Sequence, residues 1–356
     1  MASGTWQTWW RRWDCRLARR AARWARALGG TRRRVCAITD GSQACGGSPL
    51  ALTEYLHAQG IPVVWAYQSD RNQVPHWAKA VRAGTARHRW LAARSRWWVT
   101  DGLPMRVSGP DTVGRPLERG RDTRVLALVE PSVEKVGSDI VDWPLLTPRG
   151  QRQLLVRGET DVDVVVAPSS DVGRRSAQAL GFSCRTEIAS PLAEMVPARA
   201  TVRTGLGIAG DEMVVGVITT REDSIRISEA LKDAPVRVLD DSTLPARDVI
   251  GACDVLVADT SGWAAVAARL GRPIVIFTSD IRDLLSRGPG LYLPWQEGLP
   301  GPCVSGAAEL LAALTRVTEA AAFEPWAEGH AALARLAGDP EDDACQRLLR
   351  VLQEES

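Results

Sequence analysis

The sequence predicts an α/β protein built from two doubly wound domains. Short apolar runs rich in β-branched residues alternate with segments of helical periodicity between residues 35 and 277. Such alternation is typical of mainly parallel sheets covered by helices. The chain of 356 residues also exceeds the size at which a single core usually stops growing. In addition, the stretch "CDVLVADTSGWAAVAARLGRPIVIF" changes from an apolar strand to a polar turn, then to a helix and a second strand, which is a β-α-β unit.

The first predicted domain spans residues 31–190. Its apolar runs and periodic segments predict strands at 35–39, 61–67, 97–100, 124–129 and 163–168, and helices at 49–60, 87–96 and 171–181. The first of these helices ends at Gly60. Residues 185–210 contain Pro191, Pro197 and Gly205 and are expected to form the passage to the second domain.

The second predicted domain spans residues 191–356. The pattern predicts strands at 213–219, 236–239, 254–259 and 273–277. A helix over 263–270 is expected because apolar residues recur there at helical spacing, and Gly271 and Pro273 end it. The polar turn 259–262 must then lie at the carboxyl end of a parallel strand, where sheets of this kind bind ligands. The loop Asp40–Gly41–Ser42 occupies the corresponding place in the first domain.

Residues 1–30 are predicted to form a separate amphipathic helix. The first 34 residues carry ten arginines and a single acidic residue, Asp14. Tryptophans and leucines form one stripe and arginines occupy mostly the other side. This pattern favours a helix that lies in the plane of an anionic membrane surface through residues 5–28. Two alternatives are a helix packed on the protein itself and a nucleic-acid arm, and the acidic remainder of the chain argues against nucleic acid.

Composition and motifs exclude several classes. Seven cysteines without a C-x-x-C pair argue against a disulfide framework or a zinc site and fit a reducing compartment. No apolar run is long enough to span a bilayer. Neither G-x-G-x-x-G nor a Walker lysine motif is present, and the four histidines are scattered. Asp161 and Asp163 are expected to be solvated residues at the entry of a strand rather than metal ligands.

The turn that contains Thr260, Ser261 and Gly262 is the principal candidate for a binding site. The first N–H groups of a helix have no partner within the helix and lie at the positive end of its dipole, which suits an anion such as phosphate. The alternative is that Thr260 or Ser261 only caps the helix.

The order of the motifs resembles the CDP-glycerol glycerophosphotransferase family, which builds teichoic-acid-type polymers at the cytoplasmic membrane face. The resemblance covers roughly residues 35–350, and its segments include "SPLALTEYL", "KVGSDI", "VAPSSDVGRRSAQALGF", "GVITTRED", "CDVLVADTSG" and "SRGPGLYLPWQEGLPGP". It implies a GT-B-like fold with two Rossmann-like domains. It also implies that CDP-glycerol is held largely by the second domain.

The resemblance assigns roles to particular residues. On the donor side it supports phosphate contacts by the 260–262 turn and adds three candidates, Arg221, Arg287 and Gly288. Arginine suits a diphosphate because its planar fork makes paired hydrogen bonds. The alternative for each arginine is a structural ion pair. On the acceptor side the candidates are Lys135 and Ser42.

The chain departs from the family pattern at both family histidines. The catalytic histidine falls on Val129, beside Glu130, and a second histidine ahead of the donor turn has no counterpart. Residues 224–252 are expected to be too short for the strand and helix that usually stand there. Glu130 is therefore the candidate base that takes the acceptor's proton. The alternative is an exposed loop carboxylate.

The sequence predicts a peripheral enzyme at the cytoplasmic face of the membrane. It would transfer a polyol phosphate from a CDP-activated donor to a lipid-linked or polymer hydroxyl, with neither a metal nor a redox cofactor and without nucleic acid. Two alternatives remain. One is an inactive binding module that assists an active family relative, and the other is a GT-B glycosyltransferase that uses a nucleotide sugar.

Overall fold

The computed structural model describes most of the chain. The described residues are 24, 32–38, 47–67, 71–101, 119–131, 135–140, 159, 161–259, 262–278, 291–292, 299–318, 324–338 and 343–354. The predicted membrane helix therefore lies outside the described residues, apart from Trp24, which is helical and exposed. None of the helices in the described part has the length and apolar character needed to cross a bilayer.

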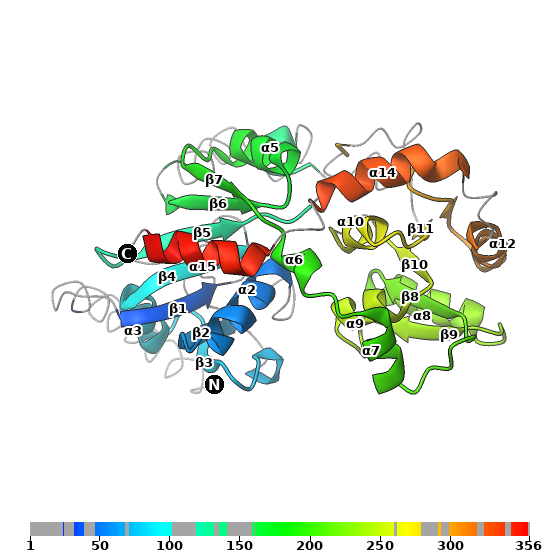
Figure 1. Ribbon diagram of the computed structural model, residues 1–356, viewed down its shortest axis with the longest axis horizontal. Helices are drawn as coiled ribbons and strands as arrows, with labels where there is room; N and C mark the ends of the chain where they lie inside the picture. Colours follow the sequence, from blue (N-terminus) through cyan, green and yellow to red (C-terminus); the bar gives the residue numbers. More distant parts are fainter. Residues whose placement is uncertain are drawn as a thin grey trace, which may run out of the picture.

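The first sheet has seven parallel strands in the order β3-β2-β1-β4-β5-β6-β7 (Figure 1). The chain enters at the middle of the sheet, winds to one edge and then to the other, as the term doubly wound implies. The strands are β1 (Arg32–Ile38), β2 (Val63–Tyr67), β3 (Lys79–Arg82), β4 (Ser95–Asp101), β5 (Arg124–Leu128), β6 (Val164–Ala167) and β7 (Arg185–Ile188).

The inner strands of this sheet are buried on both faces. Residues of β1, β4, β5 and β6 pack with the helix α2 (Gly47–Ala58) and with β2 in one apolar cluster. The opposite face packs with α3 (Ala86–Ala93). The helix α5 (Ser170–Leu180) packs near β6 and β7, next to the short helix η2 (Gly137–Asp139), and the short helix η1 (Arg71–Gln73) precedes β3.

The second sheet has five parallel strands in the order β12-β11-β10-β8-β9. They are β8 (Val214–Ile218), β9 (Arg237–Asp240), β10 (Val255–Ala258), β11 (Ile274–Phe277) and β12 (Cys303–Val304). The helices of this half are α7 (Arg199–Gly205), α8 (Arg221–Leu231), α9 (Ala246–Ala252), α10 (Gly262–Arg269), α12 (Ala307–Val317), η3 (Glu324–Trp326) and α14 (Ala327–Leu336).

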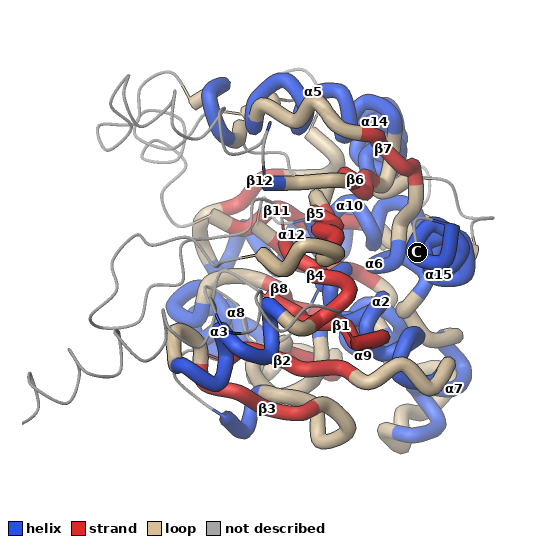
Figure 2. The backbone as a smooth tube through the Cα atoms, turned by 90° about the vertical axis from the view of Figure 1, so that its left-hand side faces the viewer, coloured by secondary structure: helices blue, strands red, loops and turns tan. Residues whose placement is uncertain are grey.

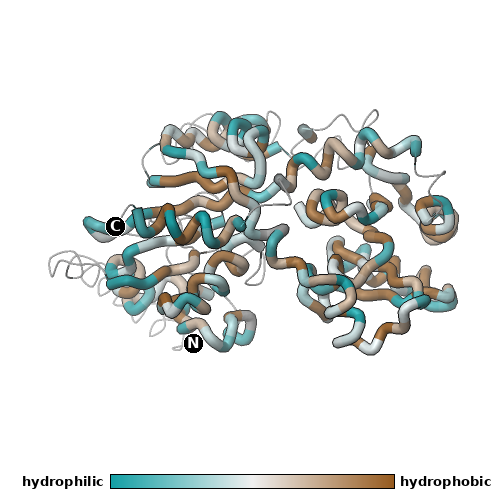
Figure 3. The backbone as a smooth tube through the Cα atoms, in the orientation of Figure 1, coloured by the Kyte–Doolittle hydropathy of each residue, from teal (hydrophilic) through white to brown (hydrophobic). Residues whose placement is uncertain are grey.

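The two sheets lie in separate lobes that are joined by continuous packing. Figure 3 shows apolar residues along the central strands of both lobes, and Figure 2 shows strands inside and helices around them. One buried cluster extends from Val129 and Val165 of the first half to Leu256 and Val266 of the second. The lobes therefore share a core.

The last helix returns to the first lobe. Helix α15 (Ala344–Glu354) packs on α2 and on the short helix α6 (Pro191–Glu194) (Figure 1). The Cys345 N–H donates to Glu194 Oε2 at 2.9 Å, and Arg347 donates to the Ile188 carbonyl at 2.7 Å. The domain boundaries predicted from the sequence placed α15 in the second domain. The amphipathic pattern of α15 indicates a buried face but not which lobe covers it.

Three further expectations need correction. Residues 185–210 do not only connect the domains, because β7 lies there as an edge strand whose polar residues stay in contact with solvent. Residues 224–252 are long enough to hold the rest of α8, all of β9 and α9. Asp163 is not simply solvated: it pairs with Arg119 and Arg124 and accepts the Val125 N–H at 2.7 Å.

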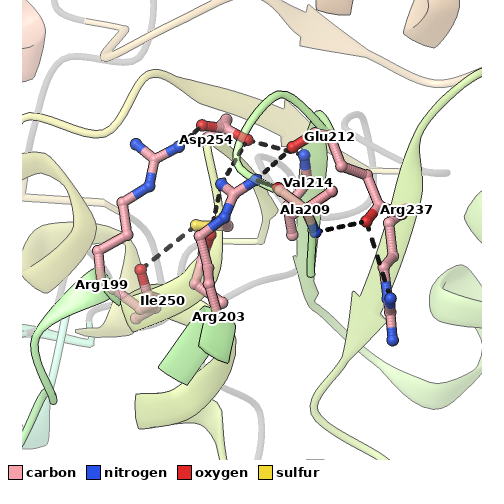
Figure 4. Close-up of polar contacts among 10 residues, drawn as sticks. Arg199, Arg203, Ala209, Glu212, Val214, Arg237, Ile250 and Asp254 are labelled. Atoms are coloured by element: carbon pink, nitrogen blue, oxygen red, sulfur yellow. Dashed lines mark hydrogen bonds and ion pairs between the residues drawn. The ribbon is translucent and has the colours of Figure 1, made fainter. Parts of the chain in front are cut away.

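The second lobe is anchored at the amino end of β10 by Asp254. Its carboxylate pairs with Arg199 and with Arg203, the latter at 3.1 Å, and accepts the Val214 N–H at 2.8 Å (Figure 4). Arg203 is nearly fully buried and also donates to the carbonyls of Ala209 and Glu212. These contacts fix α7 to the sheet at the end opposite the candidate site.

We predict that Asp254→Ala lowers the free energy of unfolding by about 3 kcal/mol, because it leaves the buried Arg203 guanidinium without its carboxylate. Urea denaturation followed by circular dichroism measures the change. Asp171→Ala is the control, since its ion pair with Arg174 is exposed and should contribute less than about 1 kcal/mol. Equal midpoints for the two variants would contradict the anchoring role.

Candidate functional site

Glu130 lies just past the carboxyl end of β5 and faces the start of α2. Its Oε1 accepts the Ser48 N–H at 2.7 Å. A Cβ on Gly47 would lie 2.2 Å from the same oxygen, and Gly47 has a φ of 65°, so a side chain at that position is excluded on both counts. The carboxylate thus caps the amino end of α2, where a negative charge interacts favourably with the helix dipole.

The environment of Glu130 favours its protonated form. Burial raises the pKa of its carboxyl group, and the hydrogen bonds from Ser48 lower it by a smaller amount. A base with a raised pKa holds a proton more strongly than an ordinary carboxylate. The predicted base is therefore a partly buried residue with a structural contact, not an exposed loop carboxylate.

The two halves meet at Gly262 and Pro131. A Cβ on Gly262 would lie 2.5 Å from the Pro131 carbonyl oxygen. Gly262 is the first residue of α10, and Pro131 follows Glu130 directly. The carboxyl end of β5 and the start of α10 are therefore in direct contact. The structure thus brings Pro131, the residue after the candidate base, into contact with Gly262, the last residue of the candidate phosphate turn, although the two are far apart in the sequence.

Arg221 lies at the carboxyl edge of the second sheet, just after the strand that neighbours β10. It is the first residue of α8, directly after β8, and β8 pairs with β10. Thr220 caps this helix by accepting the Asp223 N–H at 3.4 Å. The Arg221 side chain is exposed, and within the described part of the chain it forms no ion pair or hydrogen bond. The ion-pair alternative is thus not observed for Arg221 among these residues.

Of the other predicted site residues, only Lys135 lies in the described part of the chain apart from Gly262. Lys135 is partly buried and makes no hydrogen bond or ion pair to another described residue. Ser42, Thr260, Ser261, Arg287 and Gly288 lie outside the described residues.

Tyr292 fastens the second half to the first and was not identified from the sequence. Its hydroxyl donates to Asp139 Oδ2 at 2.7 Å and accepts the Val136 N–H at 3.4 Å, and Arg175 lies 5.1 Å above its ring. Burial and the hydrogen bond to Asp139 raise the pKa of Tyr292 to about 12. The signal was available, because Tyr292 belongs to the segment "SRGPGLY" of the family resemblance.

Carboxylates also gather at the carboxyl edge of the second sheet. Asp241 follows β9 and Asp259 follows β10. Desolvation, followed by the charges of Asp240 and Asp259, raises the pKa of Asp241 to about 6. A bound nucleotide diphosphate would meet these charges. The cations that we assign to the donor side are therefore needed to offset them.

Comparisons with known proteins bear on the family and on the fold. Residues 222–328 match the model of the family described as CDP-Glycerol:Poly(glycerophosphate) glycerophosphotransferase. The resemblance to this family is confirmed. No curated protein matches the chain.

Solved structures of the wall teichoic acid polymerase TagF share the fold. One has a TM-score of 0.75 at 16% identity and covers 97% of this chain and 94% of its own. A TagF variant soaked with CDPG has a TM-score of 0.72 at 16% identity and covers 100% and 98%. Spinosyn forosaminyltransferase SpnP has a TM-score of 0.50 at 15% identity and covers 91% and 100%. The GT-B-like fold is confirmed.

We predict that Gly262→Ala lowers the free energy of unfolding by about 1–3 kcal/mol, because the added methyl group would have to displace the Pro131 carbonyl. Thermal unfolding followed by calorimetry measures the loss. Gly205→Ala is the matched control: its Cβ would meet no atom within 4 Å. If Gly262→Ala unfolds at the same temperature as the native chain, the two halves do not pack as described.

Proposed function

We propose that the chain is a CDP-glycerol glycerophosphotransferase-like enzyme of teichoic-acid-like polymer synthesis. The observation that carries this proposal is the family match of the second half, whose α10 begins against the end of β5. The donor would be a CDP-activated polyol and the acceptor a lipid-linked or polymer hydroxyl.

The transfer itself would take place where the two carboxyl edges meet. The acceptor oxygen attacks the phosphorus of the polyol phosphate, the bond from that phosphorus to the diphosphate bridge breaks, and cytidine monophosphate leaves. The attacking hydroxyl gives up its proton to a base. Positioning and charge stabilisation are what a protein supplies to such a reaction.

The donor diphosphate would lie against the start of α10. Unpaired amides at the start of a helix bind phosphate, and this is the role that we propose for the start of α10. Arg221, free of ion pairs among the described residues, would offset charge on the diphosphate. We extend the same donor role to Thr260, Ser261, Arg287 and Gly288, and an acceptor-side role to Lys135 and Ser42.

Glu130 is our proposed base. Oε1 is engaged by Ser48, which leaves Oε2 to take the proton. Because burial raises the pKa of Glu130, a higher pH is needed to ionise it than to ionise an ordinary carboxyl group, and the rate should increase as the pH rises through this raised pKa.

We predict that Glu130→Gln lowers kcat about 10²- to 10⁴-fold and removes the pH dependence, while the amide oxygen still accepts the Ser48 N–H and keeps the fold intact. Release of cytidine monophosphate from CDP-glycerol measures the rate. Glu130→Ala should lose both the rate and some stability. Unchanged kcat in Glu130→Gln would leave Glu130 only its capping role.

One observation favours the inactive binding module as a second candidate. The carboxylate that would serve as base already holds a helix start, and no histidine occupies the family position. Such a module would keep the fold and a partner surface and assist an active relative.

We predict that the chain binds CDP-glycerol or CDP-ribitol more tightly than UDP-sugars in isothermal titration calorimetry. Arg221→Gln should weaken nucleotide binding about tenfold, whereas Lys232→Gln, at the exposed opposite end of α8, should not change it. Absence of heat with every nucleotide would favour the binding module. A preference for UDP-sugars would favour the glycosyltransferase.

The membrane association of residues 5–28 remains a proposal, supported by the tryptophan and arginine pattern. We predict that the full chain sediments with anionic liposomes and that a chain lacking residues 1–30 sediments much less. Both chains should stay in solution with neutral liposomes. Equal sedimentation of the two chains with anionic liposomes would rule out this role, and with it the basis for a peripheral location.

A further inference from the structure

A cleft of about 720 Å³ lies at the outer edge of the first sheet, away from the meeting point of the two halves. Its lining comes from the end of β2, from residues 71–78, from β3 and from the start of α3. The arginines, lysine and histidine that line it are Arg71, His76, Lys79, Arg82 and Arg87. Its volume is in the ordinary range for ligand pockets.

The charge of this cleft is unbalanced. All five of these side chains are exposed, and no described acidic residue lines the cleft. None of its arginines or its lysine forms an ion pair within the described part of the chain. Arginines elsewhere do so: Arg203 pairs with Asp254, and Arg247 pairs with Glu54 at 2.8 Å. Four neighbouring cations without a carboxylate repel one another, and an anionic ligand would relieve this repulsion.

The backbone that carries these cations is held in place. Val81 is buried in the sheet, so its neighbour Arg82 points to the opposite, exposed face of β3, and Lys79 is exposed at the start of the strand. At the start of α3, Thr85 accepts the His88 N–H at 3.2 Å, and the Gly84 N–H donates to His88 Nδ1 at 3.1 Å. His88 is fully buried. Arg82 and Arg87 therefore flank a turn fixed by hydrogen bonds, which is a preorganised arrangement for a ligand.

The shape of the site favours a flexible anionic chain over a membrane surface. A bilayer is flat and cannot enter a concave cleft. The large hydrophobic residues that are exposed in the described part of the chain are Trp24, Ile225, Leu270 and Leu311, and none of them lines the cleft. Membrane-binding faces, by contrast, combine basic residues with exposed apolar ones.

The position of the cleft relates it to the candidate transfer site. Tyr67 and Arg82, the last residues of β2 and β3, line the cleft. Because all strands of this sheet are parallel, these ends lie at the same edge as the end of β5 that leads to Glu130. Four strand spacings separate β3 from β5, which is roughly 19 Å.

We propose that this cleft binds phosphate groups of a phosphodiester polymer, several repeat units away from the hydroxyl that reacts. This inference rests on the proposed function, since the polymer would be the acceptor. The cleft would hold the polymer while its end lies at the Glu130 site, so that binding energy from remote units contributes to positioning.

A competing explanation is that the charges on β3 only protect an edge strand from pairing with other chains. That role requires charge on the strand itself, at Lys79 and Arg82. It does not require Arg71 or Arg87, and it involves no ligand.

The test compares two full-length variants that lose the same charge. The cleft variant carries Arg71→Gln, Lys79→Gln, Arg82→Gln and Arg87→Gln. The control carries Arg174→Gln, Arg226→Gln, Lys232→Gln and Arg350→Gln, which lie at exposed positions on other elements. Fluorescence anisotropy measures binding of labelled glycerol-phosphate oligomers at several salt concentrations, and calorimetry measures CDP-glycerol binding to each variant.

We expect the cleft variant to raise the Kd for oligomers at least tenfold and to flatten the salt dependence, because fewer counterions are released. The control should stay within about twofold of the native chain, and CDP-glycerol should bind all three proteins alike. Oligomer binding that the cleft variant retains, or that both variants lose equally, would overturn the proposal.

Two further outcomes distinguish this inference from the proposed function and from a membrane contact. If oligomers depend on the cleft but CDP-glycerol does not bind, the subsite stands and the proposed function fails. If the cleft variant keeps oligomer binding but no longer sediments with phosphatidylglycerol vesicles, the cleft is a membrane contact and the proposal is wrong.

Discussion

The contact between the Gly262 backbone and the Pro131 carbonyl is the constraint on which the rest of the structure depends. It leaves no room for a side chain at the start of α10. The contact also places the carboxyl edges of two parallel sheets against each other. A buried cluster that includes Val129 of the first half and Val266 of the second packs the two halves together. Two Rossmann-like lobes with a loose connection would not hold a donor and an acceptor in register. A shared core supplies the rigid orientation that the proposed group transfer would require.

Further contacts keep this arrangement closed. Tyr292 of the second half binds Asp139 of the first, Arg247 pairs with Glu54, and α15 crosses back to pack on α2 and α6. These contacts are spread around the meeting point of the halves, so no single one of them sets the geometry. The Asp254 network acts at the opposite end of the second sheet, where it fixes α7 to the strands. The stabilising Asp254 network and the candidate phosphate turn thus lie at opposite ends of the second sheet.

Much of the fold could be predicted from the sequence because its inner strands are buried on both faces. Runs such as residues 125–129 and 255–258 are wholly apolar, and a glycine lies within two residues of the end of α2, α5 and α10. The strands that were missed, β3, β7 and β12, are edge strands that are short or polar, and their pairing depends on a neighbour that no local pattern reveals. The packing of α15 on the first lobe was missed for a related reason. The amphipathic pattern of a helix shows that one face is buried but not which element covers that face.

The candidate site could be predicted only in part. Glu130 was identified because it stands beside Val129, on which the family histidine falls. Gly262 was identified separately, from the turn between a strand and a helix. Whether these residues lie near each other depends on how the two sheets pack, which no local sequence pattern indicates. The hydrogen bond from Ser48 to Glu130 joins residues 82 positions apart in the sequence, and the raised pKa of Asp241 depends on its burial and, in part, on the charge of Asp259.

The most direct test of the central claim is a crystal structure of the chain with CDP-glycerol. We predict that the diphosphate lies at hydrogen-bond distance from the Gly262 backbone amide, with Arg221 beside it and the polyol phosphate directed toward Glu130. A nucleotide bound elsewhere, or the amides at the start of α10 bonded to the protein's own carboxylates, would contradict this account.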